Sequence, residues 1–240
     1  MMMIRSFFFT VAAVAASLTG LPGAEPGLSF RVNVGSKGEK AAIMIDADRE
    51  QTGTYVHYSV KRITIINGDG SVRQAIDCRA VGDECQEWIG EYYESDAEVL
   101  KKNAGQGLPE GQDFLAMEDV NFDGSPDMIV RAGCGTGGCR YRMFLYHPVR
   151  KIFVFSSNFS AESELIRSIG VDRDRKLLEI FAGYQSEHSL VKFKVSGFDT
   201  LEQVYSKWMS ERESGIICIE TTYAEDGRPV VRKWTEKLPE

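Results

Sequence analysis

The sequence predicts a mainly β protein: an antiparallel meander of hairpins that forms a β-sandwich or a propeller-like domain, with one short helix. Hydrophobic residues recur mostly at every second position, in short runs rich in β-branched and aromatic residues. Turn-forming pairs such as Asn-Gly and Asp-Gly separate these runs and tolerate the positive φ of tight hairpins. Successive runs are therefore expected to pair as antiparallel neighbours.

The N-terminal part contains four runs of strand length and one helical segment. The runs are Phe30–Val34, Ala42–Ile45, Tyr55–Val60 and Ile63–Ile66, and the turn signal Asn67–Gly70 follows them. Asp96–Lys102, with Ser95 as a possible cap, has helix-forming composition and is the predicted short helix.

The C-terminal half continues with hairpins. Asp172–Arg175 and Ala224–Arg228 are turn signals, and each has a β-rich run on both sides. The segment Leu201–Trp208 fits both a helical spacing and a strand. We favour the strand because both neighbouring segments are predicted strands.

Composition and the N-terminus indicate a folded, exported protein. The 240 residues are 43% hydrophobic and 26% charged, and the net charge of -7 argues against a nucleic-acid binder, which needs a concentrated positive field.

Residues 1–24 combine Arg5, the apolar run Phe7–Ala16 and small residues after it, as in a secretory signal peptide. A membrane anchor is the alternative, but this run is shorter than the roughly 20 apolar residues that span a bilayer. Residues 25–240 are predicted to be a single domain in the periplasm, with a possible sub-boundary near 104–110.

The cysteines suggest two small disulfide-closed loops. In an oxidising compartment, closely spaced pairs are interpreted first as disulfides, here Cys78 with Cys85 and Cys134 with Cys139. Cys218, in an apolar run, is predicted to be a buried thiol. A zinc site is the alternative, but no His stands near these cysteines and their spacing suits tetrahedral ligation poorly.

The stretch Asp119–Asp127 has the pattern of a calcium loop. Oxygen-bearing side chains stand at positions 1, 3, 5 and 9 of this nine-residue segment, and Gly124 stands at position 6. Ca²⁺ takes six to eight oxygen ligands, and the glycine permits the sharp bend. We expect side-chain oxygens from Asp119, Asn121, Asp123 and Asp127, completed by the carbonyl of Ser125. A metal-free turn is the alternative. The loop does not match an EF-hand, because position 12 is Val130, where an EF-hand has a bidentate Glu.

This loop and the segments after it resemble two groups of proteins. The pattern D-x-N-x-D-G-x-x-D between two strands resembles the loops of FG-GAP repeats, although here there is one copy. With the following Gly-rich connection, Tyr141–Tyr146 and the hairpin His147–Phe153, it resembles exported calcium-binding immunity proteins that neutralise peptidoglycan hydrolases. These are related in fold to the periplasmic inhibitor of I-type lysozyme. The resemblance covers roughly residues 112 to 200.

The resemblance implies an inhibitor that inserts a Gly-rich loop into the active-site cleft of a lysozyme-like hydrolase. The positions that match the family's inserted loop are Gly135, Thr136, Gly137, Gly138 and Tyr141, with Arg140 as an added candidate. Glycines let the backbone approach a partner closely, a disulfide would preorganise the loop, and Arg and Tyr are common binding anchors. A plain stapled hairpin with no partner is the alternative.

Two other functions remain open from the sequence. One is a cell-envelope carbohydrate- or protein-binding module with a structural calcium ion and no inhibitory role. Trp88, Tyr92 and Tyr93 could line a sugar-binding surface, although core packing is the simpler role. The other is a hydrolase of unrecognised type. We expect no enzyme, because His57, His147 and His188 stand in no recognisable catalytic motif.

Overall fold

The computed structural model describes residues 28–34, 39–52, 55–77, 89–92, 104–106, 115–135, 138–160, 166–212, 214–224 and 226–237. The predicted signal peptide, the predicted helix Asp96–Lys102, and Cys78 and Cys85 lie outside these residues. The described residues form strands and turns and contain no helix, so the mainly β prediction is confirmed.

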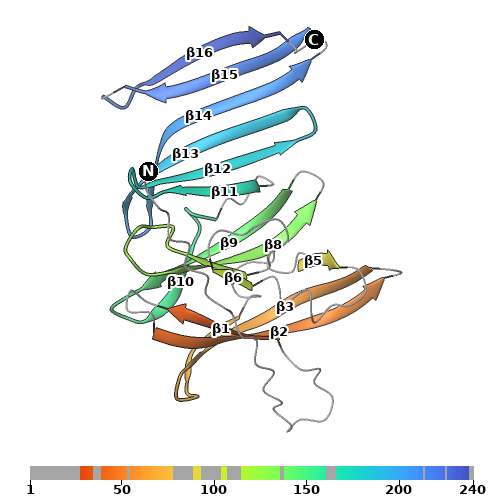
Figure 1. Ribbon diagram of the computed structural model, residues 1–240, viewed down its shortest axis with the longest axis vertical. Helices are drawn as coiled ribbons and strands as arrows, with labels where there is room; N and C mark the ends of the chain where they lie inside the picture. The colour runs from red at the N-terminus through yellow and green to blue at the C-terminus, as the bar shows by residue number, and fades with distance from the viewer. Residues whose placement is uncertain are drawn as a thin grey trace, which may run out of the picture.

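A five-stranded antiparallel sheet comes first in the chain (Figure 1). Four of its strands lie in sequence order, and the fifth pairs with the outer part of β3. The strands are β1 (Leu28–Val34), β2 (Glu39–Thr52), β3 (Tyr55–Asn67), β4 (Val72–Asp77) and β5 (Ile89–Tyr92).

An eleven-stranded sheet contains the rest of the described chain. Its strand order is β16-β15-β14-β13-β12-β11-β9-β8-β7-β6, with β10 paired to β9, and only β6 and β7 run parallel. The sheet stays open, with β6 and β16 at its two ends. Its strands are β6 (Ala104–Gln106), β7 (Leu115–Glu118), β8 (Asp127–Gly135), β9 (Gly138–His147), β10 (Ile152–Ser156), β11 (Ile166–Asp172), β12 (Leu177–Tyr184), β13 (Glu187–Gly197), β14 (Thr200–Arg212), β15 (Gly215–Tyr223) and β16 (Pro229–Glu236).

The predicted hairpins are present, with one difference in the small sheet. Leu201–Trp208 lies in a strand, and the two later turn signals connect β11 to β12 and β15 to β16. The runs Tyr55–Val60 and Ile63–Ile66, however, belong to one long strand, β3. The register passes from Asp46 opposite Arg62 to Ala47 opposite Val60, so Lys61 is an extra residue in a bulge. The bulge shifts the phase of the alternation, which is why one strand appears as two runs in the sequence.

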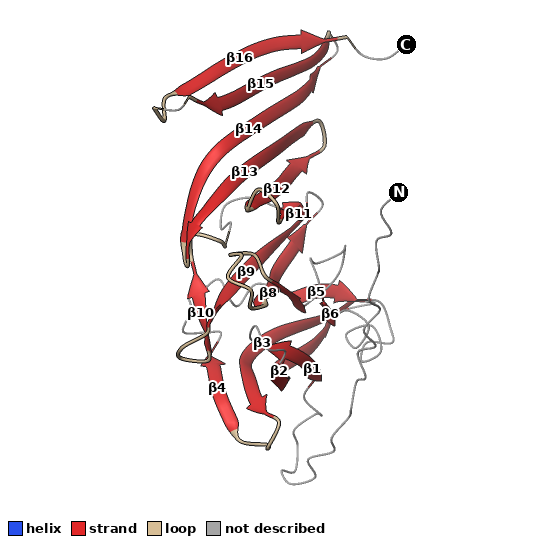
Figure 2. Cartoon of the chain, turned by 60° about the vertical axis from the view of Figure 1, so that its left-hand side comes forward, coloured by secondary structure: helices blue, strands red, loops and turns tan. Residues whose placement is uncertain are grey.

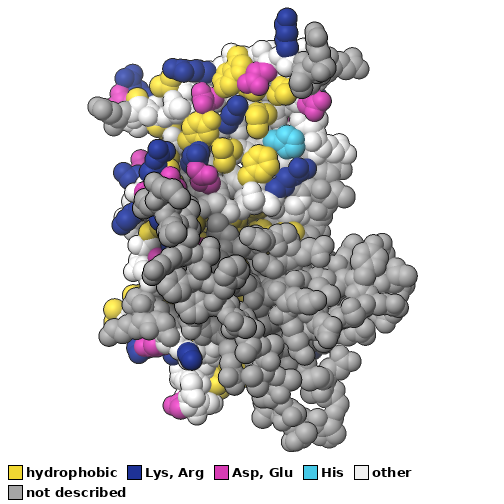
Figure 3. Space-filling model, viewed as in Figure 1, with side chains coloured by type: hydrophobic (Ala, Val, Ile, Leu, Met, Phe, Trp, Pro, Cys, Tyr) yellow, Lys and Arg dark blue, Asp and Glu magenta, His cyan; other side chains and the backbone are white. Residues whose placement is uncertain are grey.

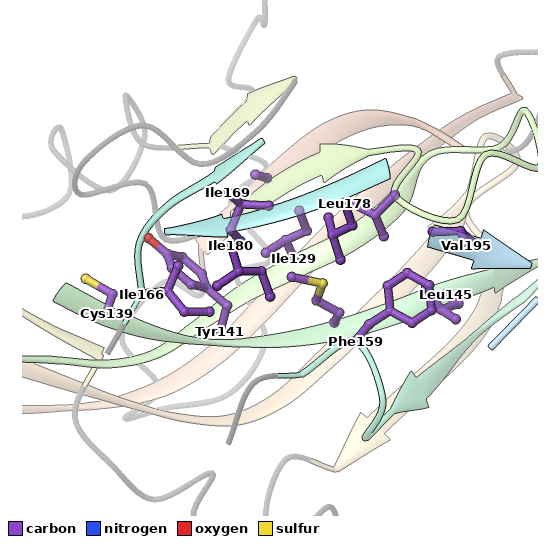
Figure 4. Packing of buried hydrophobic residues seen from close by; sticks show 13 residues of the cluster. Ile129, Cys139, Tyr141, Leu145, Phe159, Ile166, Ile169, Leu178, Ile180 and Val195 are labelled. Atoms are coloured by element: carbon purple, nitrogen blue, oxygen red, sulfur yellow. The ribbon is translucent and has the colours of Figure 1, made fainter. Parts of the chain in front are cut away.

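The main described core lies where the large sheet folds back on itself. β11 meets β9 at one register pair, Ile166 opposite Cys139, and then diverges from it. Side chains of β11, β12 and β13 therefore pack against those of β7, β8 and β9, as in a sandwich (Figure 4). The cluster is Ala116, Val120, Ile129, Cys139, Tyr141, Met143, Leu145, Phe159, Ile166, Ile169, Leu178, Ile180 and Val195.

Strand β9 is buried on both faces. Its six consecutive residues Tyr141–Tyr146 are all buried, whereas a strand with one solvent face would alternate. On the face opposite the core cluster, the hydroxyl of Tyr146 accepts a 3.5 Å hydrogen bond from Arg73 of β4. The side-chain amide of Gln74 in β4 bonds both the carbonyl and the amide of Phe153 in β10. The five-stranded sheet thus contacts the side of β9–β10 that faces away from β11–β13 (Figure 2).

Strands β14 to β16 extend beyond the core as a single layer (Figures 1 and 2). No residue of β16 is fully buried. Charged and aromatic side chains stabilise this layer through contacts across its strands: the Tyr205 hydroxyl donates to Glu220 at 3.1 Å, and Lys207 Nζ lies 5.4 Å from the ring centroid of Trp234. The face visible in Figure 3 accordingly mixes hydrophobic and charged side chains.

None of the described elements is a helix long and apolar enough to cross a membrane.

Candidate functional site

The residues predicted to bind calcium lie together in one turn between β7 and β8. The side chain of Asp119 accepts hydrogen bonds from the amides of Asp123 (3.1 Å) and Gly124 (2.9 Å). Asn121 Oδ1 also accepts from the Asp123 amide, and Asp123 Oδ1 accepts from the Ser125 amide at 2.8 Å. The predicted sharp bend is present, because Gly124 has a φ of 89°. The side-chain oxygens therefore turn inward toward the loop's own backbone.

Asp127 closes this loop from a buried position. Its side chain is fully buried and accepts three amide hydrogen bonds: Oδ2 from Val120 (3.1 Å) and Asn121 (3.3 Å), and Oδ1 from Tyr146 (2.7 Å). The pKa of Asp127 is raised to about 8, mainly by burial; the nearby Asp123 carboxylate also raises it, and the three amide donors lower it. The Asp127 carboxylate is thus a costly buried charge that a neighbouring cation would stabilise.

The residue types of the loop suit a hard cation, but their side-chain oxygens are not arranged around a common centre. Burial and the Asp123 charge raise the pKa of Asp119, and Ser125 Oγ is buried with no hydrogen-bond partner. However, within the described ranges no three His, Cys, Asp or Glu side chains form a group that could hold a metal ion. Because the loop oxygens accept backbone amides instead, calcium binding remains a prediction.

The predicted partner-binding residues lie at the opposite end of β8 and β9 from the Asp119–Asp127 loop. Gly135 and Gly138 face each other at the last register pair of the hairpin, and Thr136 and Gly137 between them lie outside the described residues. A Cβ at Gly138 would clash with the carbonyl oxygen of Ile166, and Gly138 has a φ of 137°. The base of the hairpin is therefore packed closely against β11.

Tyr141 is buried, which contradicts its predicted role as a partner contact. Its side chain is 3% exposed and belongs to the core cluster, with the ring beside Ile166 and Ile180 in Figure 4. The physical reason is that β9 is covered on both faces, so a residue three positions after the hairpin turn already lies in the core. Arg140, one position earlier, is half-buried.

The cysteines of this hairpin occupy directly opposite positions. Cys134 on β8 pairs in register with Cys139 on β9, so the predicted partners are neighbours. Cys218 is a free thiol with no exposed surface, which confirms the prediction of a buried thiol. Burial also raises the pKa of this thiol, so it is a poor nucleophile.

Sequence reasoning missed a cleft of about 450 Å³ beside the Asp119–Asp127 loop. It is lined by residues of four separate turns, among them His147, Lys176 and Phe198. Phe198 alone offered a signal: it is a large aromatic residue that stands between Gly197 and Asp199. Nothing in the spacing of the sequence places it beside residues some fifty to eighty positions away.

The histidines have structural contacts. The His147 ring lies 5.3 Å from the Phe198 ring, and its Nδ1 accepts a hydrogen bond from the Arg150 amide at 3.4 Å. His188 stacks on Phe181 at 5.9 Å. The side chains of His57 and Tyr92, and all of Trp88 and Tyr93, lie outside the described part.

Comparisons with protein-family models, with curated proteins and with solved structures find no match to this chain.

Proposed function

We propose that this chain is an exported, calcium-stabilised binding protein that inhibits a peptidoglycan hydrolase, with the tip of the β8–β9 hairpin entering the active-site cleft of its target. The observation that carries the proposal is the rigid base of this hairpin. Gly138 packs on the backbone of Ile166, and Tyr141 anchors the strand in the core. Fixing the base of a hairpin in this way reduces the conformational entropy that the hairpin loses on binding.

The set of contact residues is smaller than the sequence suggested. Tyr141 is a core residue and is not among the proposed contacts. These are Gly135, Thr136, Gly137, Gly138 and Arg140. A guanidinium beside the tip suits a glycosidase cleft, because such clefts contain paired carboxylates. A disulfide between Cys134 and Cys139 would close the tip, and their opposite positions in the register support this pairing.

The proposed calcium ion stabilises the other end of the same hairpin. At roughly 3.3 Å per residue, the nine steps along β9 separate its ends by about 30 Å. The ion would therefore lie far from the hairpin tip that enters the cleft. Its role would be to neutralise Asp119, Asp123 and Asp127, and so to fix the start of β8.

Inhibition assays test this proposal. The purified chain, without residues 1–24, is added to c-type, g-type and i-type lysozymes and to a bacterial lytic transglycosylase, and the clearing of peptidoglycan suspensions is followed. We expect inhibition of at least one enzyme, a loss of at least tenfold in Arg140→Ala, and no loss in Arg150→Ala. Arg150 is the matched control because it is exposed at the opposite end of β9. Failure to inhibit any hydrolase, or full inhibition by Arg140→Ala, would overturn the proposal.

A further inference from the structure

Four turns that are far apart in the sequence meet at one end of the core. They are the Asp119–Asp127 loop, the β9–β10 turn, the β11–β12 turn and the β13–β14 turn, and residues from all four line the cleft of about 450 Å³. Clefts of this size suit a small molecule, whereas a flat surface would suit a protein partner.

Specific contacts join three of these turns to one another. The amide of Val195 donates to the carbonyl of Lys176 at 3.1 Å, and Asn121 Nδ2 donates to the carbonyl of Phe198 at 3.4 Å. Asp199, next to Phe198, accepts a 2.5 Å hydrogen bond from Ser156, and its carbonyl accepts one from Asn158 at 3.0 Å. The cleft is thus formed before any ligand enters it, which reduces the cost of binding.

One side of the cleft carries an exposed aromatic ring. The Phe198 ring is 37% exposed, unusually high for a phenylalanine, and it lies against the His147 ring. Pro148 is exposed beside them, and Val195 is buried. This combination offers a surface on which a ring with an apolar face can stack.

Two of the polar groups that line the cleft are the ammonium of Lys176 and the carboxylate of Asp123. Lys176 is exposed and forms no ion pair within the described residues, and Asp123 has one carboxylate oxygen, Oδ2, to which no described donor bonds. Lys176 requires an acceptor such as a carboxylate, whereas Asp123 requires a donor such as a hydroxyl or an amide. A ligand that satisfies both groups and also stacks on Phe198 combines hydroxyls, a carboxylate and a flat apolar face.

We infer that this cleft binds a saccharide that carries a carboxylate. Its pyranose ring stacks its C–H face on Phe198, its hydroxyls or acetamide donate to Asp123, and its carboxylate pairs with Lys176. The inference does not depend on hydrolase inhibition, because the cleft and the hairpin tip lie at opposite ends of β9. The contacts of Lys176 and Phe198 do not depend on the calcium ion, because both residues lie outside the Asp119–Asp127 loop, whereas Asp123 belongs to both the loop and the cleft.

A matched pair of sugars tests the inference. N-acetylmuramic acid and N-acetylglucosamine differ by the lactyl ether that bears the carboxylate. Binding of each sugar to the purified chain is measured by saturation-transfer NMR and by amide shift changes. We expect both sugars to bind, the acidic one at least tenfold more tightly, with the largest amide shift changes in residues 147 and 195–198.

Variants assign the contacts. Lys176→Gln is expected to reduce the affinity for N-acetylmuramic acid at least tenfold and to leave that for N-acetylglucosamine unchanged. Phe198→Ala is expected to abolish the binding of both sugars. Val231→Ala, at an exposed position on β16, is the control and should change the affinity for neither sugar. Thermal melts check that each variant is folded. Binding of neither sugar, equal binding by the folded Lys176→Gln variant, or binding of alanyl-alanine in place of the sugars would each overturn the inference.

Discussion

The backbone amide of Tyr146 donates a 2.7 Å hydrogen bond to Oδ1 of Asp127. This bond joins the last residue of the Asp119–Asp127 loop to the end of β9, and the other oxygen of the same carboxylate accepts the amides of Val120 and Asn121. One buried side chain therefore fixes the loop, the start of β8 and the end of β9 relative to one another.

Replacing this carboxylate is expected to destabilise the protein. In Asp127→Asn, an amide NH₂ group takes the place of one acceptor oxygen and faces backbone N–H donors, which leaves at least one buried donor unsatisfied. Such a group costs about 1–3 kcal/mol. Urea unfolding in EDTA near pH 5, where folded Asp127 keeps its proton, measures the loss. A variant with the stability of the wild type would show that these hydrogen bonds contribute nothing net.

The pKa of Asp127 predicts a pH dependence in the absence of calcium. Folding raises this pKa from 3.8 to about 8, so between these values the folded state holds a proton that the unfolded state releases. The contribution of Asp127 to the unfolding free energy is therefore fully present below about pH 4 and decreases as the pH rises to about 8. Unfolding free energies in EDTA, taken as wild type minus Asp127→Asn, isolate this contribution. A difference that stays constant or grows with pH would contradict the raised pKa.

Calcium is expected to stabilise the folded protein. An ion that binds only the folded state, at a hundred times its Kd, adds about 2.7 kcal/mol. Thermal melts in excess Ca²⁺ and in EDTA measure the effect, and Asp123→Asn should reduce it. Mg²⁺ is the control, because it requires a stricter octahedral geometry and retains its water. Identical melting temperatures in Ca²⁺ and in EDTA would show that calcium does not stabilise this protein.

Gly138 and Gly70 allow a matched test of the hairpin base. Both have positive φ, but a Cβ at Gly70 would meet no atom within 4 Å, whereas one at Gly138 would meet the backbone of Ile166. Gly70→Ala should cost about 1–2 kcal/mol from the backbone conformation alone. Gly138→Ala should lower the unfolding free energy by about 3 kcal/mol or more, because backbone strain and overpacking both contribute. Chemical denaturation compares the two, and equal losses would show that β11 yields to the added methyl group.

Tyr141 is expected to act through stability. Removing a buried aromatic side chain typically costs about 3–5 kcal/mol, so Tyr141→Ala should lose this much. Tyr223→Ala, at a ring that is 37% exposed on β15, is the control and should lose less than about 1 kcal/mol. If Tyr141→Ala kept its stability and lost only hydrolase inhibition, the ring would be a contact residue after all.

Most of the candidate calcium loop could be predicted because its contacts are local. Asp119, Asn121 and Asp123 bond amides two to five positions away, so the spacing of polar residues and Gly124 already describes the turn. Asp127 was identified by the same spacing, but its bond to Tyr146 was not, because that partner is nineteen positions away. The cleft beside this loop was not predicted either, because its lining residues are also far apart in the sequence.

The alternation of hydrophobic residues and the turn signals between them were enough, in the sequence alone, to determine an antiparallel β meander, since strand period and turn chemistry are local properties of the chain. Tertiary structure alone decided which strands are covered on both faces and which turns meet. That is why Tyr141 is a core residue, why two runs form the single strand β3, and why Phe198 lies beside His147. These outcomes depend on packing between distant segments, and hydrophobic periodicity carries no information about which distant segment will provide the contact.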